Sequence, residues 1–249
     1  ESVFLTDNAF ARTHGFQEIL KGSGLLACGF MYLDKVWQYL TQEAGPTSEN
    51  CWVLIFHPGG YRGELTQPGD SKSVCYARQK SFVERFCLPL ISAGFKPVIK
   101  IHPLRARFHD LEDVTEIVGH VERENSLDEG SIACLGPESW YWEYAVKSSL
   151  ILTVGSSSVY ELWSAGLRNV VICDFEGGTR TRQYRAFECI VVDSYQQYLD
   201  LIASESFRDI EFDPLTARVF EGYHSLFDGQ STQIAYEAIT EEISARALV

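Results

Sequence analysis

Apolar residues in this chain gather in short continuous runs that alternate with stretches of helical periodicity. Near-continuous apolar runs are typical of strands in a parallel sheet with two buried faces, and their alternation with helices indicates an α/β fold. The pattern therefore predicts a doubly wound, Rossmann-like α/β domain, preceded by a short N-terminal α/β segment. Five strands are expected, with the last range as a candidate sixth: residues 51–57, 97–102, 131–135, 150–154, 169–174 and 189–192.

Helices are expected in the intervals between these strands. The spacing of apolar residues predicts a long helix over 74–93 and a short aromatic helix over 140–147. The first fifty residues show a smaller version of the same alternation. Two short strands, one helix between them and a second helix after them are expected there, at 3–6, 25–29, 10–21 and 32–40.

A boundary between two units is expected at residues 41–50. This segment contains glycine, proline and serine without a periodic apolar pattern, which is the composition of a linker. We therefore divide the chain into an N-terminal segment and hinge, 1–50, and a Rossmann-like domain, 51–249. The only methionine is Met31 and the chain starts at Glu1, so we expect it to be part of a longer protein.

Composition narrows the range of functions. The 249 residues carry a net charge of −13, which argues against nucleic acid as a partner because a phosphate backbone requires clustered Lys and Arg. The apolar runs are far shorter than the roughly 20 residues of a membrane-spanning helix. Seven cysteines without CxxC spacing indicate buried free thiols in a reducing compartment, and the histidine spacing predicts no metal site.

A glycine and three serines follow the fourth expected strand of the domain, at Gly155, Ser156, Ser157 and Ser158. An amphipathic segment begins directly after them, so this turn is expected at the N-terminus of a helix. The first N–H groups of a helix have no partner within it and favour an anion, and serine hydroxyls add donors. A phosphate site is one interpretation, and capping of the helix alone is the other.

Other strand ends carry a related set of residues. The first strand is followed by Gly59, Gly60 and Arg62, and the second by His102 and Pro103. Glycines let backbone amides approach a ligand, while histidine and arginine can neutralise phosphate charge. Because the carboxyl ends of parallel strands lie at one edge of a sheet, we expect these loops to form a single ligand site.

These motifs, taken in order, are similar to those of GT-B transferases that build bacterial surface polymers. Segments 27–34 and 52–63 resemble the hinge and first strand of the C-terminal, donor-binding half of such enzymes. The resemblance thus implies that 51–249 is a nucleotide(-sugar)-binding domain of the GT-B C-terminal type. His102-Pro103 and the serine turn resemble the His-Pro and Ser-Ser motifs of CMP-sugar transferases of the sialic acid and Kdo type. CDP-glycerol glycerophosphotransferases carry similar elements, including one like residues 228–231 before a last helix.

The resemblance implies a metal-independent transferase that moves a sugar or glycerol-phosphate unit to a glycan or polymer acceptor in surface-polysaccharide synthesis. The donor would be CMP-, CDP- or UDP-linked, with no further cofactor. His102 would be the catalytic residue, through a hydrogen bond or a proton to the leaving phosphate, and Glu161 would bind the ribose. Backbone groups of Gly136, Pro137 and Glu138 would read the base. The donor and phosphate contacts would be Gly59, Gly60, Arg62, His102, Pro103, Gly155, Ser156, Ser157, Ser158 and Glu161.

The chain also departs from these families. With only about fifty residues before the nucleotide-binding domain, segment 1–50 would be the remnant of an acceptor-side domain, and the catalytic base would lie outside this chain. The CDP-glycerol enzymes would carry a second histidine where this chain has Gly155 and Ser156. Two alternatives are a non-catalytic nucleotide-sugar-binding or scaffold module and a sugar-nucleotide epimerase. The expected location is the cytoplasm, with peripheral association at the inner face of the cell membrane as a variant.

Overall fold

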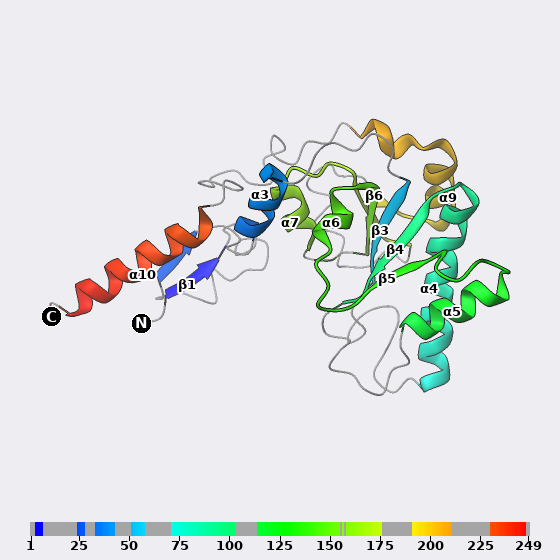
Figure 1. Ribbon diagram of the computed structural model, residues 1–249, viewed down its shortest axis with the longest axis horizontal. Helices are drawn as coiled ribbons and strands as arrows, with labels where there is room; N and C mark the ends of the chain where they lie inside the picture. The colour runs from blue at the N-terminus through cyan, green and yellow to red at the C-terminus, as the bar shows by residue number, and fades with distance from the viewer. Residues whose placement is uncertain are drawn as a thin grey trace.

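The structure is a computed structural model of the 249-residue chain (Figure 1). It describes residues 3–6, 24–27, 33–42, 51–57, 71–102, 114–154, 156, 158–175, 191–210 and 230–247. A parallel sheet is the centre of the fold. Its six strands are β3 (Trp52–Phe56), β4 (Lys96–Lys100), β5 (Ala133–Leu135), β6 (Ser148–Thr153), β7 (Val170–Cys173) and β8 (Val191–Val192).

The strands lie in the order β5-β4-β3-β6-β7-β8, and every neighbouring pair is parallel. Within this sheet, the first strand along the chain is the central β3, and β4 and β5 follow on one side of it. The chain then returns to the centre, where β6 pairs with the other side of β3, followed by β7 and β8. This is the 3-2-1-4-5-6 order of the doubly wound Rossmann fold. The predicted fold class is therefore confirmed, and the candidate sixth strand at 189–192 exists as the short β8.

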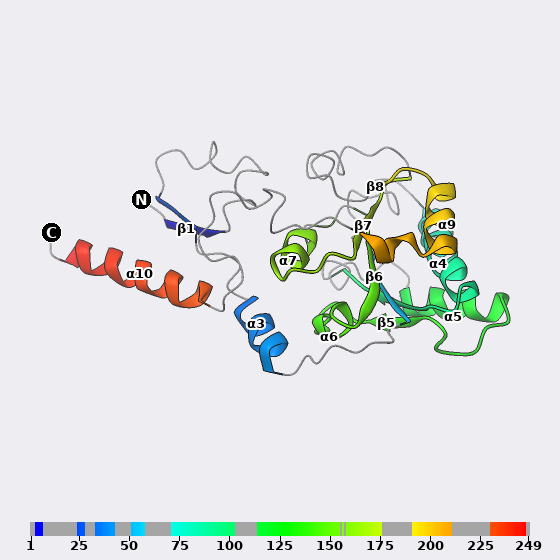
Figure 2. The ribbon, with the colours of Figure 1, turned by 90° about the horizontal axis from the view of Figure 1, so that it is seen from above.

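Helices cover both faces of the sheet, as Figures 1 and 2 show. One face carries α4 (Lys72–Ser92), α5 (Val114–Glu124) and α9 (Tyr195–Ser204), followed by the short 3₁₀ helix η3 (Ser206–Asp209). The other face carries α6 (Trp142–Ala145), α7 (Ser158–Ser164) and α3 (Leu33–Gln42).

The two helical layers correspond to two separate apolar cores. In β3, Val53 and Ile55 join the core under α4, whereas Leu54 and Phe56 join the core that contains α3, α6 and α7. All four side chains are at most 7% exposed. Successive side chains of a strand point to opposite faces, so a central strand between two layers must be apolar at every position. This explains the continuous apolar runs of the sequence.

Helix α4 illustrates how local sequence and packing combine. Its N-cap is Ser71, whose side chain accepts a hydrogen bond from the N–H of Val74. Pro89 lies inside the helix and cannot donate a backbone hydrogen bond. Near this position the hydroxyl of Tyr198, a fully buried residue of α9, donates to the carbonyl oxygen of Phe86 at 2.6 Å. This long-range bond joins α9 to α4.

The first and last described elements lie beside each other. Strands β1 (Val3–Thr6) and β2 (Gly24–Ala27) form a parallel two-stranded sheet, and α10 (Ser231–Ala247) runs next to it in both views (Figures 1 and 2). The carboxylate of Asp34 in α3 accepts a hydrogen bond from the N–H of Thr232 at 2.7 Å. The C-terminal helix is thus joined to the N-terminal segment.

Several sequence predictions fall partly or wholly outside the described residues. The helix at 10–21 lies outside them, and so does most of the boundary at 41–50, of which 41 and 42 end α3. The division at residue 50 remains a prediction. Among the described cysteines, which are free thiols, Cys75, Cys87 and Cys173 are buried as expected, whereas Cys51 and Cys134 are only partly buried. Among the described helices none has the length and apolar character needed to cross a membrane.

Candidate functional site

The direction of chain winding changes between β3 and β6, the two central strands of the sheet. Loops that leave the carboxyl ends of such strands diverge to opposite sides, which opens a crevice between them, and ligands of doubly wound proteins bind there. His57 directly follows β3, and Ser156 and Ser158 follow β6. The candidate site is therefore built from the residues at this edge.

His57 is held tightly at the end of β3. Its side chain is 2% exposed and its ring contacts Phe82 edge-on, with centroids 5.1 Å apart. The backbone N–H of His57 donates to the carbonyl oxygen of Lys100 at 3.0 Å, and this bond joins the ends of β3 and β4. The sequence pattern predicts His57 at the end of the first strand, 51–57, and does not select it as a site residue. Its burial could not have been deduced from its position next to the glycine turn.

His102 lies two residues beyond β4, at the same edge, and is half-buried. Burial lowers the pKa of its imidazole below the ordinary value of 6.5, and the nearby Lys100 ammonium lowers this pKa further. The ring is therefore neutral at pH 7, and a neutral imidazole donates through one nitrogen. Both roles predicted for His102, a hydrogen bond or a proton to the leaving phosphate, remain predictions.

The serine turn after β6 is organised by its own hydrogen bonds. The N–H of Ser156 donates to the hydroxyl oxygen of Thr153 at 3.1 Å. The hydroxyl of Ser156 accepts from the N–H of Ser158 and bonds the Ser158 hydroxyl, both at 3.2 Å. Helix α7 begins at Ser158, so Ser156 satisfies one of the first N–H groups of the helix. The capping interpretation is thus observed, and the phosphate interpretation stays a prediction.

Glu161 lies one turn into α7 and is engaged within the protein. Its carboxylate accepts a hydrogen bond from the hydroxyl of Tyr141 at 2.9 Å. Tyr141 precedes α6, and its ring meets Phe56 of β3 edge-on at 5.1 Å. The carboxylate is therefore held near the end of the central strand by a link between α7 and α6. Its predicted contact with a ribose remains a prediction.

The loop after β5 is held by a lysine that the sequence did not single out. Lys100, the last residue of β4, is 5% exposed, and its ammonium donates to the carbonyl oxygens of Gly136 and Pro137 at 2.9 and 2.5 Å. Burial lowers the pKa of Lys100, and the carboxylate of Glu138 opposes this shift. The three residues predicted to read the base thus form one structured loop. A lysine inside an apolar run is the signal that could have drawn attention to Lys100.

The remaining predicted contacts lie outside the described residues. They are Gly59, Gly60, Arg62, Pro103, Gly155 and Ser157. The described site residues lie at the edge of the sheet formed by the carboxyl ends of its strands, because each of them follows the end of a strand. They are His102, Ser156, Ser158, Glu161 and the loop 136–138. Within the described ranges, no three metal-ligating side chains gather closely enough to hold an ion.

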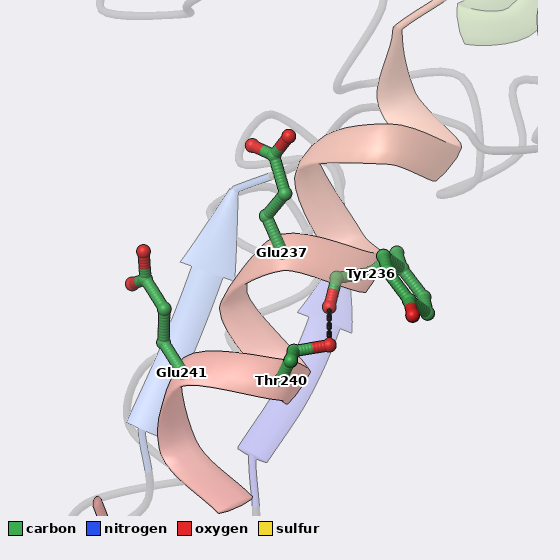
Figure 3. Close-up of a pocket in the computed structure, with 4 residues that line it drawn as sticks. All are labelled: Tyr236, Glu237, Thr240 and Glu241. Carbon is green, nitrogen blue, oxygen red and sulfur yellow. Dashed lines mark hydrogen bonds between the residues drawn. The ribbon is translucent and has the colours of Figure 1, made fainter. Parts of the chain in front are cut away.

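Two surface hollows are lined by residues that the structure describes. One, on α10, is lined by Tyr236, Glu237, Thr240 and Glu241, and Figure 3 shows Tyr236 on a different side of the helix from the two carboxylates. The Thr240 hydroxyl there donates to the carbonyl oxygen of Tyr236, so it serves the helix itself. The other hollow lies between α4 and α9. Neither contains a predicted site residue.

This strand order defines a doubly wound, Rossmann-like α/β protein, and the carboxyl ends of its central strands, with the polar residues that follow them, form a candidate ligand edge. Neither a comparison with models of protein families nor one with curated proteins finds a match. Solved structures do match. A UDP-GlcNAc 2-epimerase of Methanocaldococcus jannaschii, in complex with UDP-GlcNAc and UDP, aligns with a TM-score of 0.49 and 15% identity over 93% of this chain.

An assigned UDP-N-acetylglucosamine 2-epimerase of Listeria monocytogenes aligns with a TM-score of 0.50 and 14% identity over 89% of this chain. A variant of the wall teichoic acid polymerase TagF aligns with a TM-score of 0.47 and 11% identity over 90%. The likeness to the Listeria protein shows a shared fold, which is of the GT-B type. The chain spans only 59%, 54% and 53% of the lengths of these three proteins, in the order given.

Proposed function

We propose that this chain is the donor-binding part of a metal-independent transferase, with residues 51–249 as the nucleotide-sugar-binding domain. It holds a CMP-, CDP- or UDP-linked donor, from which a sugar or glycerol-phosphate unit passes to a glycan or polymer acceptor in surface-polysaccharide synthesis. The acceptor-side base comes from sequence outside this chain. The protein works in the cytoplasm, at the inner face of the membrane when its acceptor is bound there.

The observation that carries this proposal is the reversal of strand order between β3 and β6, with hydrogen-bonding side chains at that edge. His102 supplies a neutral donor beyond the end of β4, the neighbour of β3, and Ser156 and Ser158 supply hydroxyls beyond the end of β6. Donors fixed by a sheet edge need no rearrangement when a leaving phosphate gains negative charge. The donor set suits a diphosphate or phosphate ester.

The chemistry assigned to these residues is electrostatic. In the proposed complex, His102 donates a hydrogen bond to the phosphate that leaves with the nucleotide. That anion in turn raises the pKa of the imidazole, so binding is coupled to uptake of a proton. The serine hydroxyls bind the same phosphate while Ser156 keeps its backbone contacts. The backbone of the loop 136–138 faces the base.

Calorimetric titration of the 249-residue chain with CMP, CDP and UDP tests this function. At least one nucleotide should bind, and His102→Ala should weaken it about 10- to 100-fold, the range for a lost hydrogen bond to a charged group. His120→Ala is the matched control, since His120 lies within α5, is not a predicted site residue and bonds Tyr76 of α4. Absence of binding to all three nucleotides would refute the donor-binding role.

The same preparation can distinguish the remaining interpretations. Incubation of the chain with UDP-GlcNAc, followed by separation of the sugars, would reveal a 2-epimer if the protein were an epimerase. Nucleotide binding without turnover in the full-length protein, with acceptor present, would instead indicate a binding or scaffold module. Transfer to an acceptor that is abolished by His102→Ala would agree with the proposal.

A further inference from the structure

The ammonium of Lys100 is committed to three backbone carbonyls. Its Nζ donates to Ile101 at 3.0 Å, Gly136 at 2.9 Å and Pro137 at 2.5 Å. A lysine ammonium has three protons, so these bonds use its whole donor capacity. The acceptors belong to two different loops, one after β4 and one after β5. Lys100 therefore acts on the shape of both loops.

The sheet does not require a charge at this position. Strand β4 is already paired with β5, and the N–H of Ile101 donates to the carbonyl oxygen of Leu135 at 3.0 Å. The residue paired with Lys100 on β3 is Phe56, which is apolar and buried. Since burial of an ammonium group costs desolvation, an apolar side chain would serve packing at least as well. The lysine must have a role beyond packing.

Peptide geometry shows what Lys100 orients. The peptide unit is planar and trans, with its C=O and N–H pointing in opposite directions, and no cis bond occurs in the described chain. Because the Pro137 carbonyl points at the ammonium, the N–H of Glu138 points away from it. The Ile101 carbonyl fixes the N–H of His102 in the same manner. Two amide donors at the ligand edge thus take their direction from one side chain.

We propose that Lys100 is a positioning residue that sets recognition of the nucleobase. By holding the Gly136 and Pro137 carbonyls inward, it turns the amide of Glu138 toward the ligand as a hydrogen-bond donor. The complementary group is an acceptor on the base, such as the O2 oxygen that cytosine and uracil share. This inference rests on the proposed function, because it assigns the base-reading role to a loop of that same site.

The test compares a ligand that has the base with one that lacks it. Calorimetry would measure the affinities of CMP, UMP and ribose 5-phosphate for three forms of the 249-residue chain: wild type, Lys100→Met and the control Lys147→Met. Lys147 is exposed and pairs only with Glu143 among the contacts described. Lys100→Met should weaken the nucleotides at least tenfold and leave ribose 5-phosphate within about twofold. His102→Ala should weaken all three ligands.

A second variant keeps the inference testable if Lys100→Met does not fold. Pro137→Gly leaves the lysine in place but frees the loop backbone, so it should cause the same selective loss of nucleotide affinity. Amide spectra of Lys100→Met should also show shifts confined to Glu138, His102 and their sequence neighbours. Equal losses for nucleotide and ribose 5-phosphate, or unchanged affinity for both, would overturn the positioning role. Failure of wild type to bind any of the ligands would instead refute the proposed function.

Discussion

Removal of the Asp34 carboxylate should release α10 from the rest of the fold. Asp34 accepts from the N–H of Thr232, the second residue of α10, and is itself 9% exposed. The first turn of α10 contains no acidic residue, and a carboxylate 198 residues earlier in the chain accepts one of its N–H groups. Asp34→Ala removes both a hydrogen bond and a negative charge at the positive end of the helix.

The expected loss can be worked out from these two contributions. A lost N-cap bond costs about 1 kcal/mol, and a lost charge at a helix N-terminus costs about 0.3–1 kcal/mol. Together they give roughly 1–2 kcal/mol, which corresponds to a factor of about 5–30 in the population of the detached helix. Asp34→Asn keeps an acceptor oxygen and should lie between wild type and Asp34→Ala.

Hydrogen exchange measured by mass spectrometry is the suitable assay, because it reports local opening of one helix. Amides of 231–247 should exchange about 5–30 times faster in Asp34→Ala, while the buried helix α4 keeps its protection. Asp128→Ala, in an exposed turn after α5, is the matched carboxylate control. Unchanged exchange of α10, or equal acceleration of α10 and α4, would show that Asp34 is not its anchor.

Two further predictions concern single side chains of the main domain. The lowered pKa of His102 means that the unfolded chain binds more protons just below pH 6.5, so the folded state should lose stability as the pH falls through this range. Urea denaturation at pH 7.5 and 5.5 should show a smaller decline for His102→Gln than for wild type; equal declines would contradict the shift. Tyr198→Phe should cost about 1 kcal/mol, because it removes the bond to the Phe86 carbonyl, and Tyr195→Phe, on the half-buried neighbour, should be close to neutral. A urea midpoint for Tyr198→Phe that equals wild type would refute that bond's contribution.

Strands were predictable from the sequence because both sheet faces are buried. Every position of a central strand must then be apolar, which leaves a run that needs no periodicity to be recognised. The 51–57 and 169–174 ranges differ from β3 and β7 by only one residue at each end. Helix α5 carries Val114, Ile117, Val118 and Val121 at helical spacing, and this signal was present but was not used.

From the sequence, the site could be located only to the edge of the sheet where the strands end. Parallel strands bring all their carboxyl ends together, so the loops of interest followed from the strand pattern. The burial of His57 and the three bonds of Lys100 depend on neighbours that are distant in sequence, such as Phe82 and Pro137. No local pattern encodes such contacts. For the same reason the engagement of Glu161 by Tyr141 was not foreseen.

The strand order also has a consequence for how the protein forms. Trp52 at the start of β3 pairs with Ser148 of β6, about a hundred residues further along, and contacts over such distances in sequence make folding slow. A ribosome that has released β3, α4 and β4 has therefore produced only one wall of the central crevice. Its opposite wall arrives after β6 and α7 emerge. Until β6 is synthesised, the edge of β3 that pairs with it stays unpaired. The nascent chain is therefore most prone to aggregation between the release of β3 and the release of β6.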